Sequence, residues 1–160
     1  MAIKVGDKLP TVSLKHMDKD GMQTVSTDDL FKGKKVVLFA LPGAFTPTCS
    51  AKHLPGFVTH AEAIRGKGID AIACLSVNDA FVMDAWGKAQ NVGDKVLMLA
   101  DGNADFSKAV GLTEDDSEYG MGIRACRYAL VAENGVVKTL AVEEGDAFDV
   151  SSAESILEKL

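Results

Sequence analysis

Long apolar runs, separated by short polar breaks, dominate the middle of the chain. Residues 36–41, 69–77 and 96–100 are nearly continuous apolar stretches, which is typical of strands covered on both faces of a sheet. Residues 127–132 and 136–142 flank an Asn-Gly pair, a strong hairpin signal between two apolar strands. The pattern therefore predicts three buried strands followed by an antiparallel hairpin.

The first third of the chain predicts a smaller hairpin and a short helix. Residues 11–15 and 22–25 have the composition of two strands around a turn at 18–21. Residues 26–29, Ser-Thr-Asp-Asp, resemble a capping box that opens a helix ending by Gly33.

Helix signals separate the buried strands. Thr46 is a suitable N-cap with Pro47 in the first turn, and Pro55-Gly56 should break this helix, leaving a longer second piece from about Phe57 to Arg65. The next helix begins at Asn78-Asp79, and its apolar stripe is expected to contain Phe81, Val82, Ala85 and Trp86.

The last part of the chain predicts a short helix at 104–110, an acidic surface loop at 112–122 and a final helix capped at 151–154. The order β–α–β–α–β–β–α from Val36 onward, with an inserted α–β pair, indicates an α/β fold. We expect one thioredoxin-like domain over residues 1–160, a mixed central sheet flanked by helices on both faces. Catalytic and ligand-binding residues of such sheets lie at the carboxyl ends of the parallel strands.

Cys49 follows one of these strand ends. In the first turn of a helix, a thiol lies among unpaired backbone N–H groups and near the positive end of the helix dipole, which favours the thiolate. A reactive cysteine is therefore predicted, although an inert buried cysteine is the alternative.

Composition narrows the classes of partner. The net charge of −6 offers no basic stripe for nucleic acid. No apolar run approaches the ~20 residues of a membrane span, and the start of the chain has no signal-peptide core. Three cysteines without a CxxC pair indicate a reducing compartment, so a cytoplasmic protein is expected. Only Cys49 and His53 lie close together in sequence among Cys and His, so no metal site is expected.

Three segments resemble the peroxiredoxin family in order along the chain. PGAFTPTCSAKHLPGF contains the pattern Pro-x-x-x-Thr-x-x-Cys, and ACLSVNDAFVMDAW and RYALVAENGVVK follow. They look like the subfamily of peroxiredoxin five and the plant type II enzymes, and the likeness runs from about Val5 to Leu160.

This resemblance implies a peroxidase that uses thiols, needs no cofactor or metal, and reduces hydrogen peroxide and alkyl hydroperoxides. By resemblance, Cys49 is the peroxidatic nucleophile, Thr46 bonds thiolate and peroxide, Pro42 shields the thiolate, and Arg127 lies beside the sulfur. The chemistry is consistent with these roles, because attack on an O–O bond needs an ionised sulfur and donors aimed at the oxygens.

Competing interpretations remain at some of these positions. Arg124 competes with Arg127, and strand alternation places the two on opposite faces. His53, four residues after Cys49, would make a Cys–His hydrolase, with a packing or rim histidine as the alternative. A non-enzymatic redox-sensing or binding module is the third hypothesis.

The oxidised Cys49 must be reduced again, because a sulfenic acid otherwise proceeds to irreversible states. Cys74 matches the second cysteine of the plant type II enzymes, but its strand looks buried, and Cys126 should point away from the arginine's face. We therefore expect an external thiol, glutathione with glutaredoxin or thioredoxin, with a Cys49–Cys74 disulfide as the alternative. The resemblance also implies a homodimer, for which Phe45 and Phe81 are interface candidates.

Overall fold

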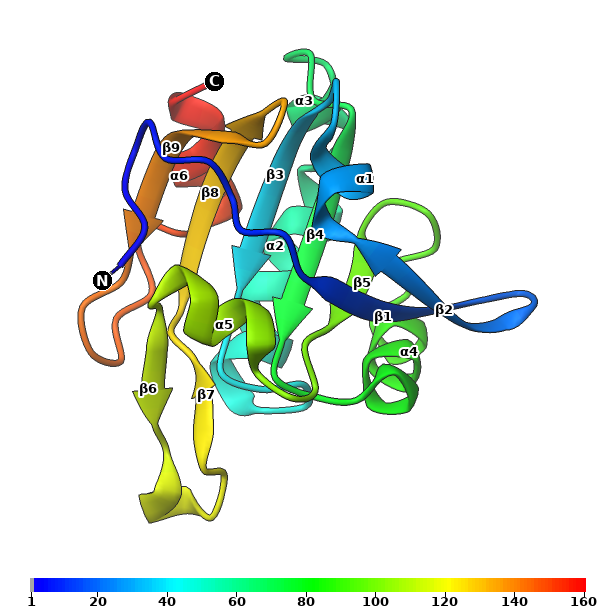
Figure 1. Cartoon of the computed structure of the whole chain (residues 1–160), viewed down its shortest axis with the longest axis vertical. Helices are drawn as coiled ribbons and strands as arrows, with labels where there is room; N and C mark the ends of the chain where they lie inside the picture. The colour runs from blue at the N-terminus through cyan, green and yellow to red at the C-terminus, as the bar shows by residue number, and fades with distance from the viewer. Residues whose placement is uncertain (1) are drawn as a thin grey trace.

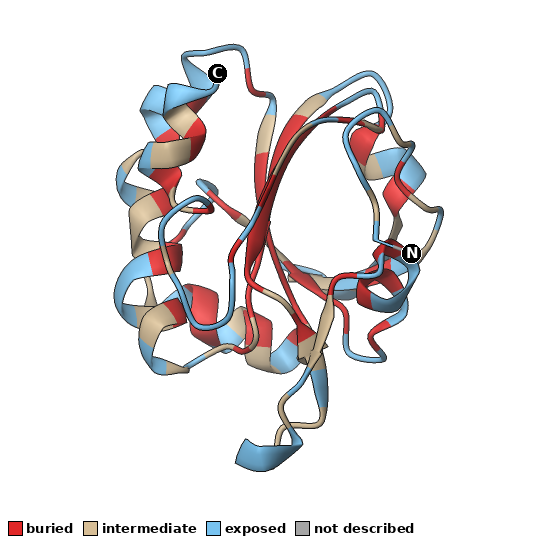
Figure 2. Cartoon of the chain, turned by 90° about the vertical axis from the view of Figure 1, so that its left-hand side faces the viewer, coloured by how far each residue is buried: buried red, intermediate tan, exposed pale blue. Residues whose placement is uncertain are grey.

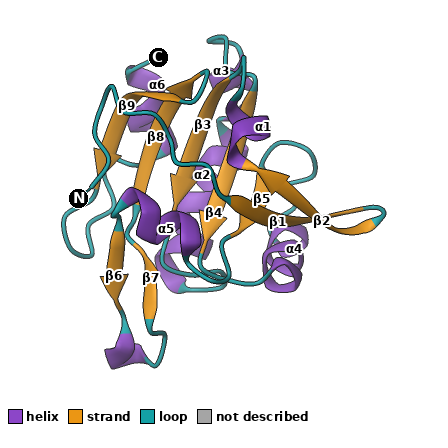
Figure 3. Cartoon of the chain, viewed as in Figure 1, coloured by secondary structure: helices purple, strands orange, loops and turns teal. Residues whose placement is uncertain are grey.

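The computed structural model describes residues 2–160, which form a seven-stranded mixed sheet of order β2-β1-β5-β4-β3-β8-β9 (Figures 1 and 3). The three central strands, β3 (Lys35–Ala40), β4 (Ala71–Ser76) and β5 (Leu97–Ala100), are parallel. The hairpin of β8 (Tyr128–Glu133) and β9 (Val136–Val142) pairs antiparallel with β3. The predicted buried strands and late hairpin are confirmed.

The other edge of the sheet is the N-terminal hairpin. It consists of β1 (Ser13–Asp18) and β2 (Gly21–Ser26), and β1 pairs antiparallel with β5. The short helix α1 (Thr27–Phe31) follows, with the Ser26 hydroxyl accepting a hydrogen bond from the Asp28 N–H. Both features were predicted.

Helices cover both faces of the sheet (Figure 2). One face is covered by η1 (Cys49–His53), α2 (Leu54–Thr59), α3 (Ala61–Arg65), α4 (Ala80–Ala89) and α6 (Ala153–Glu158), and the other by α1 and α5 (Asp105–Val110). The predicted thioredoxin-like α/β fold, with a mixed sheet between two helical layers, is confirmed.

Strand β3 joins the two cores. Its alternate side chains enter opposite hydrophobic clusters, Val37 and Phe39 on one face and Val36 and Leu38 on the other. This double burial explains the continuous apolar run. It also fixes the carboxyl end of β3, from which the chain continues toward Cys49.

The acidic segment 112–122 is not a loop, and that prediction was wrong. Strand β6 (Thr113–Asp115) and the 3₁₀ turn η2 (Ser117–Tyr119) belong to a separate hairpin whose second strand is β7 (Ile123–Ala125). Glu114 pairs with Arg124 in the register of this hairpin. Opposite charges on facing strands support the pairing. The acidic segment alone does not reveal that strand β7 pairs with it.

The predicted break at Pro55 was also wrong. The helical backbone passes through Pro55, and the irregularity lies before it, in the π turn η1, where the Leu54 N–H donates to the Cys49 carbonyl. Pro55 has no N–H to give to the turn before it. The break falls instead at His60, between α2 and α3.

The predicted apolar stripe of α4 was largely wrong. The buried side of α4 consists of Ala80, Met83, Trp86 and Gly87, while Phe81 and Ala85 are exposed. The helix packs closely on β5 through a glycine: a Cβ at Gly87 would lie 2.9 Å from Met98 Cγ. Hydrophobicity cannot identify a contact made by a residue without a side chain. Among residues 2–160, no helix is long and apolar enough to cross a membrane.

Candidate active site

Cys49 lies in the first turn of a helix, as predicted. The chain becomes helical at residue 47, the Thr46 carbonyl accepts from the Ser50 N–H at 2.9 Å, and Cys49 opens the π turn η1. Its side chain is fully buried. Its burial protects the thiol from bulk water.

Arg127 reaches the sulfur directly. Its Nη2 donates to Cys49 Sγ at 3.1 Å, and only 9% of the residue is exposed. The guanidinium is permanently charged, so this is a charge-assisted contact to the sulfur. The structure thus brings Arg127 and Cys49 together as the family resemblance implies.

Arg124 also points to this region, so the alternation argument that separated the two arginines was wrong. Arg124 lies on β7, whereas Arg127 lies in the connection between β7 and β8, and one strand period does not relate them. Arg124 donates to the carbonyls of Met121 at 2.9 Å and Pro42 at 3.2 Å. It therefore anchors the loop that carries Pro42 and leaves the sulfur to Arg127.

Thr46 does not cap the helix with its side chain. Its hydroxyl donates to the Gly43 carbonyl at 2.6 Å. Because the single hydroxyl proton is used there, the oxygen lone pairs remain free to accept a hydrogen bond from a bound ligand. The N-cap prediction for this side chain was wrong, although the Thr46 backbone does begin the helix.

His53 supports Arg127 and forms no dyad with Cys49. Arg127 Nη1 lies 2.8 Å from His53 Nδ1, and His53 Nε2 lies 3.1 Å from the Ser151 carbonyl. Arginine can only donate, so Nδ1 is the acceptor and Nε2 carries the hydrogen. Burial, with the charge of Arg127 adding to it, lowers the pKa of His53 to about 3, so the ring is neutral. With both nitrogens occupied, the Cys–His hydrolase arrangement is not present.

A carboxylate holds the loop that presents the Ser151 carbonyl. Glu143 accepts hydrogen bonds from the backbone N–H groups of Asp149, Val150 and Ser151, and from the Ser151 hydroxyl at 2.6 Å. Burial raises the pKa of Glu143, but these hydrogen bonds outweigh it and hold the pKa below its ordinary value. The carboxylate is therefore ionised near neutral pH and fixes the backbone of residues 149–151.

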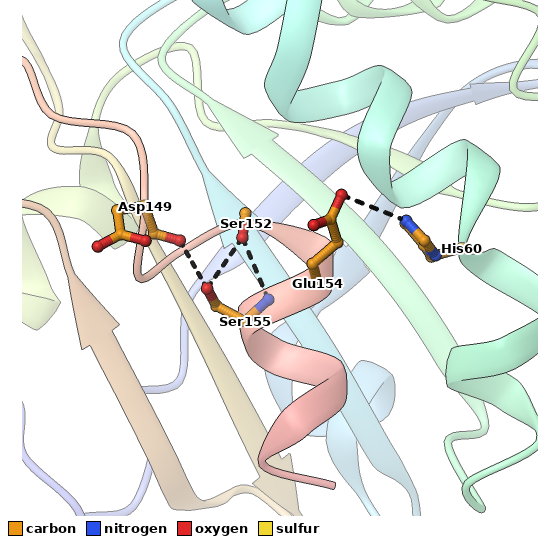
Figure 4. A network of polar contacts seen from close by, with 5 residues as sticks. All are labelled: His60, Asp149, Ser152, Glu154 and Ser155. Carbon is orange, nitrogen blue, oxygen red and sulfur yellow. Dashed lines mark hydrogen bonds and ion pairs between the residues drawn. The ribbon is translucent and has the colours of Figure 1, made fainter.

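The start of α6 fixes the same loop from its other end (Figure 4). The Ser152 hydroxyl accepts from the Ser155 N–H at 3.1 Å, and the Ser155 hydroxyl donates to the Asp149 carbonyl at 2.8 Å. Nearby, His60 Nε2 lies 3.7 Å from Glu154 Oε1, across to the end of α2. Ser151 is thus held from both sides, which fixes His53 and through it Arg127.

Ser50 ties the π turn to helix α4. Trp86 Nε1 donates to the Ser50 hydroxyl at 3.0 Å, and Gln90 Nε2 donates to the Ser50 carbonyl at 3.2 Å. This carbonyl needs an outside donor, because Pro55 has no N–H and the Leu54 N–H is used by Cys49. Side chains from α4 thereby replace the missing helical bonds beside the sulfur.

The other two cysteines are free thiols. Cys74 is fully buried in the same cluster as Cys49, and burial raises the pKa of its thiol well above the ordinary value. Burial also raises the pKa of Cys126, which packs against the opposite core. Neither thiol is ionised near neutral pH, and Cys74 is closed off from solvent.

A pocket of about 460 Å³ opens in front of the arginine. Pro42, Thr46 and Arg127 line it. Cys49 is connected to the pocket by Arg127, which donates to its sulfur. Among residues 2–160, no group of three or more His, Cys, Asp or Glu side chains could hold a metal ion. The arrangement can bind a small polar molecule between a hydroxyl and a guanidinium, next to the Cys49 sulfur.

Sequence reasoning missed Glu143 altogether, and it missed the role of His53 as the support of Arg127. The spacing of four residues did place His53 near Cys49. Its partners lie 74 and 98 residues away in the chain, at Arg127 and Ser151. No local pattern marks such contacts, so the supporting role could only come from the folded structure.

Comparison with known proteins agrees with this geometry. The chain matches the Redoxin family over residues 4–157. It is 53% identical to the chloroplastic Peroxiredoxin-2E of Arabidopsis thaliana over 99% of this chain and 70% of that protein, and 50% identical to Peroxiredoxin-2C of rice over 99% and 98%. The crystal structure of reduced Prx3 from Vibrio vulnificus in complex with hydrogen peroxide superposes with a TM-score of 0.95, at 53% identity and 98% coverage of both chains. The chain therefore belongs to the redoxin family and is a peroxiredoxin, an enzyme that reduces peroxides at the expense of thiols.

Proposed function

We propose that Cys49 is the peroxidatic cysteine and that its substrates are hydrogen peroxide and small organic hydroperoxides. The observation that carries this proposal is the 3.1 Å contact between Arg127 Nη2 and Cys49 Sγ behind a pocket lined by Thr46 and Pro42. A hydroperoxide whose O–H donates to Thr46 Oγ1 presents its O–O bond to the sulfur and to the guanidinium.

The reaction is a displacement at oxygen. The thiolate electron pair attacks the terminal peroxide oxygen, the O–O bond breaks, and the leaving oxygen takes a proton to become water or an alcohol. Cys49 is oxidised to a sulfenic acid and the peroxide is reduced by two electrons. Arg127 stabilises the charge as it moves from sulfur to the leaving oxygen.

An external thiol completes the cycle. A glutathione, glutaredoxin or thioredoxin thiol condenses with the sulfenic acid, releasing water and leaving a mixed disulfide, and a second thiol reduces this disulfide. The burial of Cys74 and the raised pKa values of Cys74 and Cys126 support an external thiol over an internal one.

We further place the enzyme in the type II, peroxiredoxin-five subfamily, as a cytoplasmic homodimer. The type II relatives at about half identity and three unpaired cysteines support the first two assignments. Phe45 and Phe81, exposed by 56% and 64%, support the third as interface residues beside the active site.

Oxidation kinetics test the proposal. Hydrogen peroxide should oxidise the wild type far faster than a free thiol, yield a sulfenic acid at Cys49, and leave Cys49→Ser unreactive. Oxidation at the rate of a free thiol would instead favour a redox-sensing module. For recycling, Cys74→Ser and Cys126→Ser should both turn over with glutaredoxin or thioredoxin, and loss of turnover in Cys74→Ser would establish the internal disulfide.

A further inference from the structure

Three carboxylates line the pocket in front of Arg127. Glu114 and Asp116 come from the hairpin of β6 and β7, and Asp146 comes from the loop between β9 and α6. The hairpin extends from the end of the sheet at which β3 and β4 terminate (Figure 1). Among the described residues that line this pocket, Arg127 is the only basic one.

The charge of Arg127 is already matched at the site. One terminal nitrogen donates to Cys49 Sγ and the other to His53. When the sulfur is ionised, thiolate and guanidinium form a neutral pair. Arg124 faces Glu114 across the hairpin and offsets part of its charge, but no salt bridge among the described residues holds Asp116 or Asp146, so an incoming ligand still meets a net negative field.

Glu114 and Asp116 line the same pocket and interact electrostatically. Burial first, then the hydrogen bond and charge of Asp116 and the charge of Asp146, together raise the pKa of Glu114 to about 7, while Arg127 opposes the shift. Asp116 Oδ2 is buried and has no hydrogen-bond partner within residues 2–160. Glu114 therefore gains its negative charge near neutral pH.

The remaining lining is mostly apolar. Pro42, Pro47, Tyr119 and Met121 contribute the surfaces on which an alkyl or aryl group can pack. An uncharged organic hydroperoxide therefore binds through these apolar contacts. A negatively charged one makes the same contacts but is repelled by the carboxylates, so it binds more weakly.

We propose that this pocket selects uncharged hydroperoxides and disfavours those bearing a carboxylate or another anionic group, and that Glu114, Asp116 and Asp146 determine this selectivity. The inference rests on the proposed role of Cys49 and adds the charge class of its substrates. The carboxylates act by repulsion, which is a common way to obtain specificity.

A matched pair of substrates tests the inference. Cumene hydroperoxide and its para-carboxylate analogue differ by one charge on the same scaffold. Their rates of Cys49 oxidation can be followed by stopped-flow fluorescence of Trp86, the single tryptophan, whose indole bonds Ser50 beside Cys49. At low salt, we expect the neutral compound to react at least about tenfold faster, and the ratio to fall as salt screens the field.

Removal of the carboxylates should abolish this preference. The relevant quantity is the ratio of the two rates within each variant, so a general loss of activity cancels. Glu114→Gln, Asp116→Asn and Asp146→Asn should each lower the ratio about fivefold or less, as expected for one unit charge in a partly hydrated pocket, and the triple variant should bring it near one.

Glu118→Gln is the matched control, because Glu118 is an exposed acid on the same hairpin outside the pocket. Its ratio should equal that of the wild type. The ratio should also rise between pH 6 and 8 in the wild type as Glu114 ionises, and should do so less in Glu114→Gln. The charged and titratable groups around Glu114 are Arg124 on the facing strand, Asp116, Asp146, Arg127 and Cys126.

Two results would overturn the inference: equal rates for the two compounds in the wild type at low salt, or an unchanged ratio in the triple variant. A different failure, in which hydrogen peroxide and cumene hydroperoxide both leave Cys49 unoxidised, would refute the peroxidatic role instead. The two failures are therefore distinguishable.

Discussion

Replacing His53 by leucine should slow peroxide reduction without removing any group that touches the peroxide. His53 Nδ1 accepts from Arg127 Nη1 at 2.8 Å while Nε2 donates to the Ser151 carbonyl. Leucine fills similar space but offers no acceptor. One N–H of a buried guanidinium then lacks its partner, and the side chain can turn away from the Cys49 sulfur.

The size of the effect follows from the cost of that lost contact. A hydrogen bond to a charged group contributes about 1.5–3 kcal/mol. If the loss falls on the conformation that donates to Cys49, the oxidation rate should drop by about 10- to 100-fold. Arg127→Ala, which removes the donor itself, should lose more.

Stopped-flow fluorescence of Trp86 measures the rate directly, with circular dichroism to verify folding. His53→Gln is the conservative variant, because its amide carries both an acceptor and a donor. It should restore part of the lost rate, which a purely space-filling role would not explain. A folded His53→Leu protein that reacts at the wild-type rate would refute the positioning role.

Three further predictions concern stability and the π turn. Ser50→Ala removes the acceptor of the buried Trp86 indole, so it should lower the free energy of unfolding by about 1–3 kcal/mol. It should also speed the reduction of oxidised Cys49 by thiols, because the π turn opens more easily. An unchanged melting temperature would contradict this prediction. Gly87→Ala puts a Cβ 2.9 Å from Met98 Cγ and should lower the free energy of unfolding, measured with urea, by about 1–3 kcal/mol. An unchanged free energy of unfolding would contradict the close approach of α4 to β5. The pKa of His53 falls from 6.5 in the unfolded chain to about 3 in the folded protein. The neutral ring therefore contributes fully to stability above pH 6.5, and this contribution is lost as the pH falls toward 3, by up to about 1.4 kcal/mol per pH unit. Urea unfolding at pH 7.5 and pH 5 should show a smaller loss of stability for His53→Gln than for the wild type.

The parts of the fold that follow local rules could be predicted from the sequence. Strand β3 is apolar on both faces because both cores need it, and the caps at Asp79 and Ser152 bond the N–H groups expected of them. Cys49 followed from its position after that strand. Its partner Arg127 came from family resemblance, since an arginine near a strand end carries no such signal by itself.

The features that could not be predicted depend on distant partners. Pro55 was expected to break the helix, but a π turn absorbs the irregularity and Gln90 satisfies the carbonyl left open at Ser50. The acidic segment became a strand because residues 123–125 pair with it. His53 was considered as a nucleophile's base, whereas the contacts from Arg127 and to Ser151 make it a support. In each case a local rule was overridden by a contact far along the chain.

The central claim is that the guanidinium of Arg127 activates the Cys49 sulfur toward peroxide. The most direct test is the second-order rate constant for oxidation of Cys49 by hydrogen peroxide in the wild type and in Arg127→Ala, at low salt and pH 7.5. We expect the variant to remain folded and to react at least about 100-fold more slowly, as loss of a charge-assisted contact in the transition state requires. A folded Arg127→Ala protein with the wild-type rate constant would contradict the account.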